Sequence, residues 1–188
     1  MNNTNETLQQ PCTRKNSLLI PFLTILLGAS LLFLTLFVPF VSATDTYEET
    51  LRKFAVFGED ESGMTTEDYI KVSLFEFSKV YSAETDDSNV ALGFMILFYA
   101  YVSLAVLTTL FAIFKKPIPV VIFSILTFLV YGLNKWDFND RGVITNTRYV
   151  WGISPIIFYI ATALLIVGSI FLFVAKRKIK KQNSSIVK

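Results

Sequence analysis

Residues 153–175 read ISPIIFYIATALLIVGSIFLFVA and contain no Asp, Glu, Lys or Arg. A helix of this length spans roughly 35 Å at about 1.5 Å per residue, which is enough to cross a hydrocarbon layer of about 30 Å. The basic sequence KRKIKK follows directly at 176–181. This stretch therefore predicts a transmembrane helix that ends at a charged membrane surface.

Three further runs without a charged residue precede it, at 18–41, 90–114 and 118–133. The first two are long enough to cross a membrane, whereas the third would span only about 24 Å. Lysines flank the third run on both sides, and their long side chains can reach the interface. The alternative for this run is a buried helix of an aqueous core, but its apolar neighbours leave no such core to join. We therefore predict an all-α integral membrane protein with four transmembrane helices.

The composition agrees with this class, since 53% of the 188 residues are hydrophobic and 17% are charged. Soluble domains carry about a quarter charged residues, so a water-soluble globule, a disordered tail and a nucleic-acid binder are excluded. The formal net charge of +2 is too close to balance to indicate a polyanionic partner. The frequent use of Phe, Ile, Asn and Lys is typical of an AT-rich bacterial genome.

Basic residues mark the segments that we expect in the cytoplasm. Residues 1–17, 115–117 and 176–188 together carry ten basic residues and one acid, whereas 42–89 carries twelve acids and four bases. The positive-inside rule then places both termini in the cytoplasm of a plasma-membrane protein. The predicted segments are a cytoplasmic tail (1–17), a first span (18–41), an acidic extracytoplasmic loop (42–89), a second span (90–114), a cytoplasmic loop (115–117), a third span (118–133), a short extracytoplasmic loop (134–152), a fourth span (153–175) and a basic cytoplasmic tail (176–188).

An alternative concerns the first span, because small residues at 41–43 resemble a signal-peptidase site. Cleavage after Ala43 would leave a mature chain with three spans. The apolar run is longer than the signal-peptide core of about 7–15 residues, which favours an uncleaved anchor.

The acidic loop is expected to be partly helical, with two short amphipathic helices. Thr44 or Asp45 caps the first of them, and Thr65 or Thr66 caps the second. A strand over 71–81 is the alternative, since the apolar residues there are not cleanly periodic. We interpret the apolar stripes of both helices as an interaction surface, made of Tyr47, Leu51, Phe54, Ile70, Leu74, Phe77 and Tyr81. The segment 138–143 is predicted to form a tight turn with Gly142 at positive φ.

The inventory of reactive side chains argues against catalysis. The chain has no histidine, and Cys12 is its single cysteine. These counts exclude Cys–His and Ser–His–Asp catalysis, an intramolecular disulfide and a zinc site. We predict that the protein is not an enzyme and needs no cofactor. The weaker alternative is an enzyme that acts on lipid through Asp86, Asp87 and Asp140.

Acidic clusters at 59–61 and 86–87 leave a calcium site in the outer loop as an open alternative. The segment 137–142 shares an Asp, an Asn and a Gly with the start of an EF-hand loop. It departs from that pattern at Arg141 and at Arg148, where the loop needs oxygen ligands. We therefore predict no metal site and interpret these acids as solvated loops.

The four predicted spans contain no Asp, Glu, Lys or Arg, although transporters and channels commonly place such groups along their pathways. Their polar side chains are hydroxyls, which more often join helices than line a pore. Small residues at 28–30 and 168–169 are the expected points of closest helix approach. We predict an interaction, accessory or regulatory subunit of the plasma membrane that binds another membrane or envelope protein. The alternative is a small transport component or permease that works as an oligomer.

The basic tail favours contact with anionic lipid headgroups at the inner leaflet. The residues concerned are Lys176, Arg177, Lys178, Lys180 and Lys181.

The layout, with both ends inside, a longer first outer loop and a shorter second one, resembles that of claudin-like four-helix proteins. The first outer loop lacks the paired cysteines and the Trp-Gly-Leu-Trp signature of that family. No site residue is therefore carried over from it.

Overall fold

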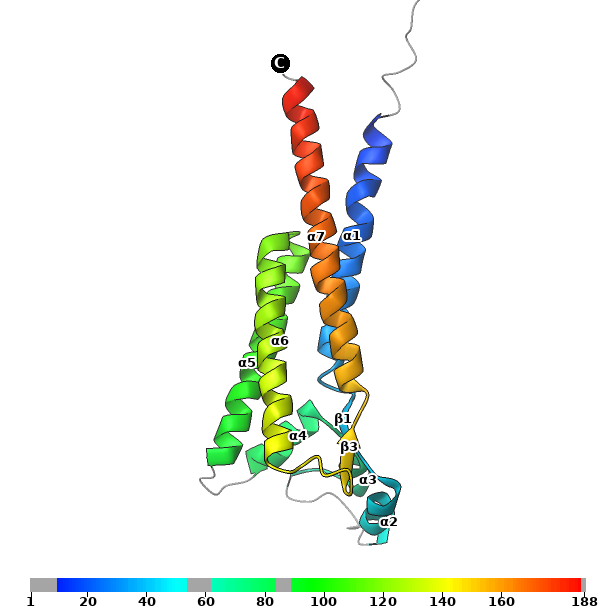
Figure 1. Ribbon diagram of the computed structural model, residues 1–188, viewed down its shortest axis with the longest axis vertical. Helices are drawn as coiled ribbons and strands as arrows, with labels where there is room; N and C mark the ends of the chain where they lie inside the picture. Colours follow the sequence, from blue (N-terminus) through cyan, green and yellow to red (C-terminus); the bar gives the residue numbers. More distant parts are fainter. Residues whose placement is uncertain (1–9, 54–61, 84–88, 187–188) are drawn as a thin grey trace, which may run out of the picture.

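The computed structural model describes residues 10–53, 62–83 and 89–186, and it is mostly helical. Four long helices lie along one another (Figure 1): α1 (Gln10–Leu34), α5 (Asn89–Ile113), α6 (Pro117–Asp140) and α7 (Ser154–Ile186). Helix α1 packs mainly on α7, and α5 packs mainly on α6. The start of α1 and the end of α7 lie at the same end of the molecule and project beyond the turn between α5 and α6.

Three of these helices, α5, α6 and α7, are long and apolar enough to cross a membrane. The apolar part of α1, Leu18–Leu34, is shorter. The predicted first span of 18–41 therefore extends beyond the helix, because the chain leaves the helix after Leu34 and enters a β-strand at Pro39. The predicted third span of 118–133 lies within α6, which continues to Asp140 and is about 36 Å long.

A three-stranded antiparallel sheet, which the sequence analysis did not predict, joins the two outer segments of the chain. Strand β1 (Pro39–Ala43) lies between β2 (Lys71–Ser73) and β3 (Tyr149–Trp151). Val41 pairs with Val72 on one side and with Trp151 on the other. The sheet therefore holds β3, which lies between α6 and α7 in the sequence, close to the end of α1.

Three short helices surround the sheet: α2 (Asp45–Lys53), α3 (Thr66–Ile70) and α4 (Leu74–Ala83). The predicted helix start at Thr65 is confirmed by a capping box. The Thr65 side chain accepts a hydrogen bond from the Asp68 backbone N–H, and the Asp68 carboxylate accepts one from the Thr65 backbone N–H. The expected helix through Ile70–Tyr81 is wrong as a single element. Lys71–Ser73 forms β2 between α3 and α4, because the backbone groups of β1 need a partner on that side.

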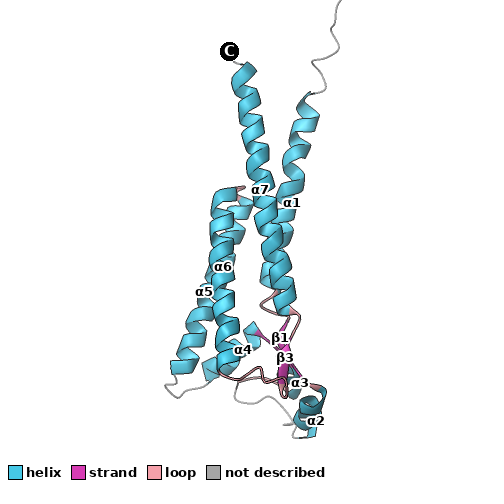
Figure 2. Cartoon of the chain, viewed as in Figure 1, coloured by secondary structure: helices cyan, strands magenta, loops and turns pink. Residues whose placement is uncertain are grey.

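These strands and short helices together form a cap at the end of the bundle where α1 ends and α7 begins (Figure 2). We define the cap as residues 39–53, 62–83 and 141–151. The predicted turn at 138–143 is confirmed in part, since Gly142 has φ +69°, although α6 occupies its first three residues.

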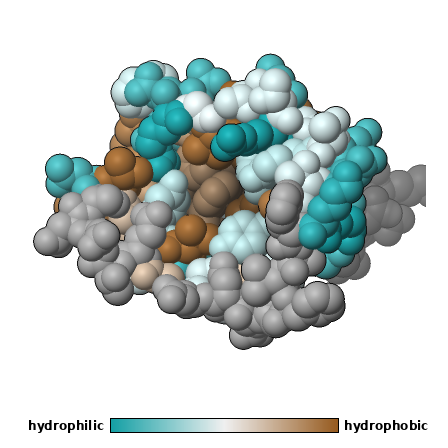
Figure 3. All heavy atoms as spheres, turned by 90° about the horizontal axis from the view of Figure 1, so that it is seen from below, coloured by the Kyte–Doolittle hydropathy of each residue, from teal (hydrophilic) through white to brown (hydrophobic). Residues whose placement is uncertain are grey.

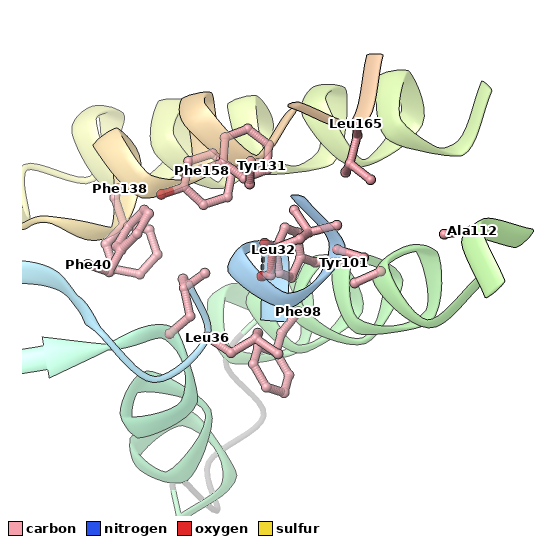
Figure 4. Packing of buried hydrophobic residues seen from close by; sticks show 14 of the residues in the cluster. Leu32, Leu36, Phe40, Phe98, Tyr101, Ala112, Tyr131, Phe138, Phe158 and Leu165 are labelled. Carbon is pink, nitrogen blue, oxygen red and sulfur yellow. Dashed lines mark hydrogen bonds between the residues drawn. The ribbon is translucent and has the colours of Figure 1, made fainter. Parts of the chain in front are cut away.

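The core between cap and bundle is aromatic (Figure 4). Phe40 from β1 is fully buried, and its ring lies edge-on to Phe138 at 5.2 Å and to Trp151 at 5.4 Å. The rings of Tyr131 and Phe158 stack at 3.8 Å between α6 and α7. Aromatic rings paired in these orientations stabilise the fold by more than the burial of their apolar surface alone.

Helices α1 and α7 approach closely at two glycines, as the sequence predicts. A Cβ atom on Gly28 would lie 3.0 Å from the carbonyl oxygen of Ala161 and 3.0 Å from Cγ of Leu165. A Cβ atom on Gly168 would lie 2.8 Å from Cγ1 of Ile25. Small residues at such crossings let two backbones approach and gain dispersion contacts.

Candidate functional site

A network of buried hydroxyl groups lies where α1 ends. The hydroxyls of Thr35 and Tyr101 are 2.5 Å apart, and both lie within hydrogen-bonding distance of the Leu32 carbonyl oxygen, at 2.6 Å and 3.2 Å. Ser154 Oγ donates to the Thr35 carbonyl at 2.9 Å and lies 3.3 Å from the Tyr131 hydroxyl. The network therefore connects α1, α5, α6 and the start of α7.

The physical reason for this network is the end of a helix in apolar surroundings. The last carbonyl groups of a helix have no partner within it, and each buried carbonyl left unpaired costs free energy. Thr35, Tyr101 and Ser154 are at most 1% exposed, so side-chain hydroxyls take the place that water has at a surface helix end. The backbone N–H of Phe75 satisfies the next carbonyl, that of Leu36, at 3.0 Å. The network thus supports the fold and holds no acid–base pair.

Replacing Ser154 with Ala removes the hydroxyl that donates to the Thr35 carbonyl. We expect a loss of about 1–3 kcal/mol of unfolding free energy, because that buried carbonyl loses its donor. The measurement is the apparent melting temperature of the purified protein in mild detergent. Ser30→Ala is the matched control, since the exposed Ser30 hydroxyl bonds only to Leu26 within its own helix. Equal effects of the two substitutions would contradict this role of the network.

The structure divides the predicted interaction surface between the cap interior and its outside. Ile70 is 3% exposed and Leu74 is 1% exposed, so neither is available to a partner. Tyr47 and Leu51 are half-buried on α2, and the Tyr47 ring lies edge-on to Tyr149 at 5.3 Å. Phe54 lies outside the described residues.

Phe77 and Tyr81 of α4 also contact residues of other elements of the protein. The Phe77 ring lies 4.6 Å from that of Phe138 and 6.2 Å from that of Phe94. The Tyr81 hydroxyl accepts a hydrogen bond from Arg141 at 2.6 Å. Most of the apolar stripe that the sequence marks as an interaction surface therefore packs against the cap and the ends of α5 and α6.

The outer side of the cap is polar. Helix α2 has no buried residue, and Arg52 pairs with Glu48 on α2 and with Glu67 on α3. Hydrogen bonds to Glu67, which has the larger effect, and to Glu48 raise the pKa of Arg52. Burial raises the pKa of Tyr149, which keeps its proton and donates to the Tyr69 carbonyl at 2.8 Å. Seen from the cap end, hydrophilic residues cover much of the rim, with hydrophobic residues between them (Figure 3).

A groove lies at the opposite end of the bundle, between the α5–α6 turn and the projecting part of α7. Its volume is about 290 Å³. Its walls are apolar, formed by Pro117, Ile118, Pro119 and Phe173, and its charged residues are Lys116, Lys176, Arg177 and Lys180. We call this the basic groove.

The turn beside the basic groove holds its residues in place. Helix α5 ends in a Schellman motif with Lys115 at φ +54°. The backbone N–H of Lys115 donates to the Ala112 carbonyl, and that of Lys116 donates to the Phe111 carbonyl. Glycine usually occupies this left-handed position, because a side chain there costs free energy. The Lys115 carbonyl accepts from the Lys176 ammonium group, which fastens α7 to the turn.

Three of the five residues predicted to contact anionic lipid line the groove, namely Lys176, Arg177 and Lys180. Lys178 and Lys181 are exposed on the same helix but do not line it. From the sequence, Lys116 is assigned to the flank of the third span and to the cytoplasmic side, and neither Lys116 nor Phe173 is predicted to contact lipid headgroups. The signal was present, because positions 173, 176, 177 and 180 share one face of a helix.

No three His, Cys, Asp or Glu side chains come together within the described residues. The acidic clusters at 59–61 and 86–87 lie outside the described part of the chain. The EF-hand-like segment is not a loop at its start, since α6 continues to Asp140 and Asp137 pairs with Arg141.

The fold defines a class: a mostly helical protein with three helices long and apolar enough to cross a membrane and one shorter apolar helix. Comparison with family models, with curated proteins and with solved structures finds no match. The functional conclusion therefore depends on the geometry of this chain.

Proposed function

We propose that all four long helices cross the plasma membrane of a bacterium, with both termini in the cytoplasm and the cap outside. Within the described residues, every Asp and Glu lies in the cap helices or near the cap end of α6. The basic groove and the tail lie at the other end, as the positive-inside rule requires. Apolar side chains such as Ile96, Leu129 and Phe171 are more than half exposed on the outer helix faces, as lipid contact requires.

The first helix is retained in this proposal. A cut after Ala43 would release β1, the central strand of the sheet. It would also remove Phe40 and Val41, both 0% exposed in the aromatic core. The uncleaved chain is therefore the form that accounts for the folded cap.

We infer that the protein is a non-enzymatic accessory subunit that binds another membrane or envelope protein through the outside of its cap. The observation that carries this inference is α2, an amphipathic helix without a buried residue. Tyr47 and Leu51 of this helix are half-buried, whereas Thr46, Glu49 and Thr50 are exposed, so the polar face of α2 is available to a partner. Asp45 and Glu49 are exposed one turn apart on α2, which favours a partner with a basic surface.

The test is chemical cross-linking in intact cells, followed by purification of the full-length chain in mild detergent. The wild-type protein is expected to yield one cross-linked complex of fixed stoichiometry. The double charge reversal Asp45→Lys with Glu49→Lys should abolish it. Asp140→Lys, which changes an exposed acid at the end of α6, is the matched control and should leave it intact. A protein that remains alone in every case would contradict the accessory role.

A further inference from the structure

The basic groove combines an apolar surface with a cationic one. One wall is apolar, and the residues around it are cationic. Both kinds are present where α7 continues past the α5–α6 turn (Figure 1), which is the level at which the proposed topology places the inner-leaflet headgroups. A phospholipid has two parts that match these surfaces. Its acyl and glycerol portion is suited to the apolar wall, and its phosphate is suited to the cations.

No acid of the described residues neutralises the cations of the groove. Within the described residues, the acids all lie in the cap or near the cap end of α6, so none can pair with Lys116, Lys176 or Lys180. Lys115 and Lys116 lie near enough to repel the Lys176 ammonium group. An anion in the groove would relieve this repulsion, and the N-terminal end of α6 would add its positive dipole end.

Two of these side chains are held in place before any ligand binds. Lys176 donates to the Lys115 carbonyl, which leaves two of its N–H donors for a ligand. The Arg177 guanidinium lies over the Phe173 ring at 4.4 Å, and both residues line the groove. Side chains already ordered lose less conformational entropy on binding.

We propose that the basic groove is a binding site for one anionic phospholipid. Its phosphate is bound by Lys116, Lys176, Arg177 and Lys180, and its glycerol and upper acyl segment lie on Pro117, Ile118 and Phe173. This assignment is narrower than contact along the whole basic tail, because Lys178 and Lys181 take no part in it. It does not depend on the accessory role of the cap.

The test is native mass spectrometry of the full-length protein in mild detergent, titrated with palmitoyl-oleoyl phosphatidylglycerol. Lys176→Gln with Lys180→Gln removes two groove cations, whereas Lys178→Gln with Lys181→Gln removes the same charge from the same helix outside the groove. The groove variant is expected to bind about 30-fold more weakly than the wild type. The control variant should bind as the wild type does. Palmitoyl-oleoyl phosphatidylcholine should bind equally to all three proteins.

Equal weakening in both double variants, or none in either, would overturn the site in favour of diffuse attraction. Displacement of the lipid by excess inorganic phosphate would also overturn it, since a free anion would then suffice. Circular dichroism checks that each variant is folded. If the groove variant does not fold, the neighbouring single substitutions Lys180→Gln and Lys181→Gln make the same comparison, with an effect expected only for Lys180→Gln.

Discussion

Gly152→Ala is expected to lower the unfolding free energy by about 3 kcal/mol, which corresponds to a fall of about 10 °C in melting temperature. A Cβ atom at this position would lie 2.2 Å from the carbonyl oxygen of Pro39 and 2.7 Å from the Pro39 carbonyl carbon. Both are backbone atoms of the central strand, so they cannot move aside as a flexible side chain would. The Gly152 backbone N–H also donates to the Phe40 carbonyl at 2.9 Å, and separation of the strands would break this bond.

The loss should extend beyond the substituted residue, because Phe40 is packed against rings from α6 and β3. The experiment follows thermal unfolding of the purified protein in mild detergent by far-UV circular dichroism. Gly132→Ala is the control, since a Cβ atom there meets no atom within 4 Å apart from its chain neighbours and the backbone of its own helix. It is expected to be neutral or to stabilise the protein by up to about 1 kcal/mol, because alanine favours a helix over glycine. Similar melting temperatures for both variants would refute the close approach of β1 and β3.

Gly28→Leu is expected to have an effect of at least similar size, about 3 kcal/mol, because it separates α1 from α7. The first side-chain atom alone would meet the Ala161 carbonyl oxygen at 3.0 Å, and a leucine adds three carbons beyond it. The α1–α7 contact is the most extensive between any two elements of the described chain. In a membrane such a contact depends on close packing, because lipid is as apolar as the helix surfaces.

Gly93→Leu tests whether the effect is specific to this interface. Gly93 is exposed on α5, and a Cβ atom there meets nothing within 4 Å. We expect Gly93→Leu to melt at or slightly above the wild-type temperature and to keep the wild-type elution volume in gel filtration. Destabilisation by Gly93→Leu equal to that by Gly28→Leu would mean that added bulk, rather than the α1–α7 contact, is responsible.

The long helices could be predicted because lipid-spanning segments have to be apolar, and α5 agrees with the predicted span 90–114 within one residue at each end. The sheet could not be predicted. Strands of three residues, such as β2 and β3, are too short to show a period of two, and their partner β1 begins inside an apolar run that otherwise predicts a helix. Their pairing joins residues far apart in the sequence, which no local pattern records.

The basic groove was predictable only in part. The cluster of charges at 176–181 identified the tail as a lipid contact, but the number of charges does not distinguish Lys180 from Lys181. That distinction depends on the helical phase of α7 and on the position of the turn at Lys116, which tertiary packing fixes. The hydroxyl network was missed for a similar reason, because its need arises only where α1 ends at Leu34.

The central claim, four membrane spans with both ends on the cytoplasmic side, is tested most directly by cysteine labelling with a membrane-impermeant maleimide. Cys12, the single natural cysteine, reports on the N-terminal segment. Asp140→Cys and Ser184→Cys, each in a Cys12→Ser background, report on the cap end of α6 and on the end of α7. The account predicts labelling of Asp140→Cys in intact cells, and labelling of Cys12 and Ser184→Cys only after the cells are permeabilised. Labelling of either terminal cysteine in intact cells, or protection of Asp140→Cys, would contradict it.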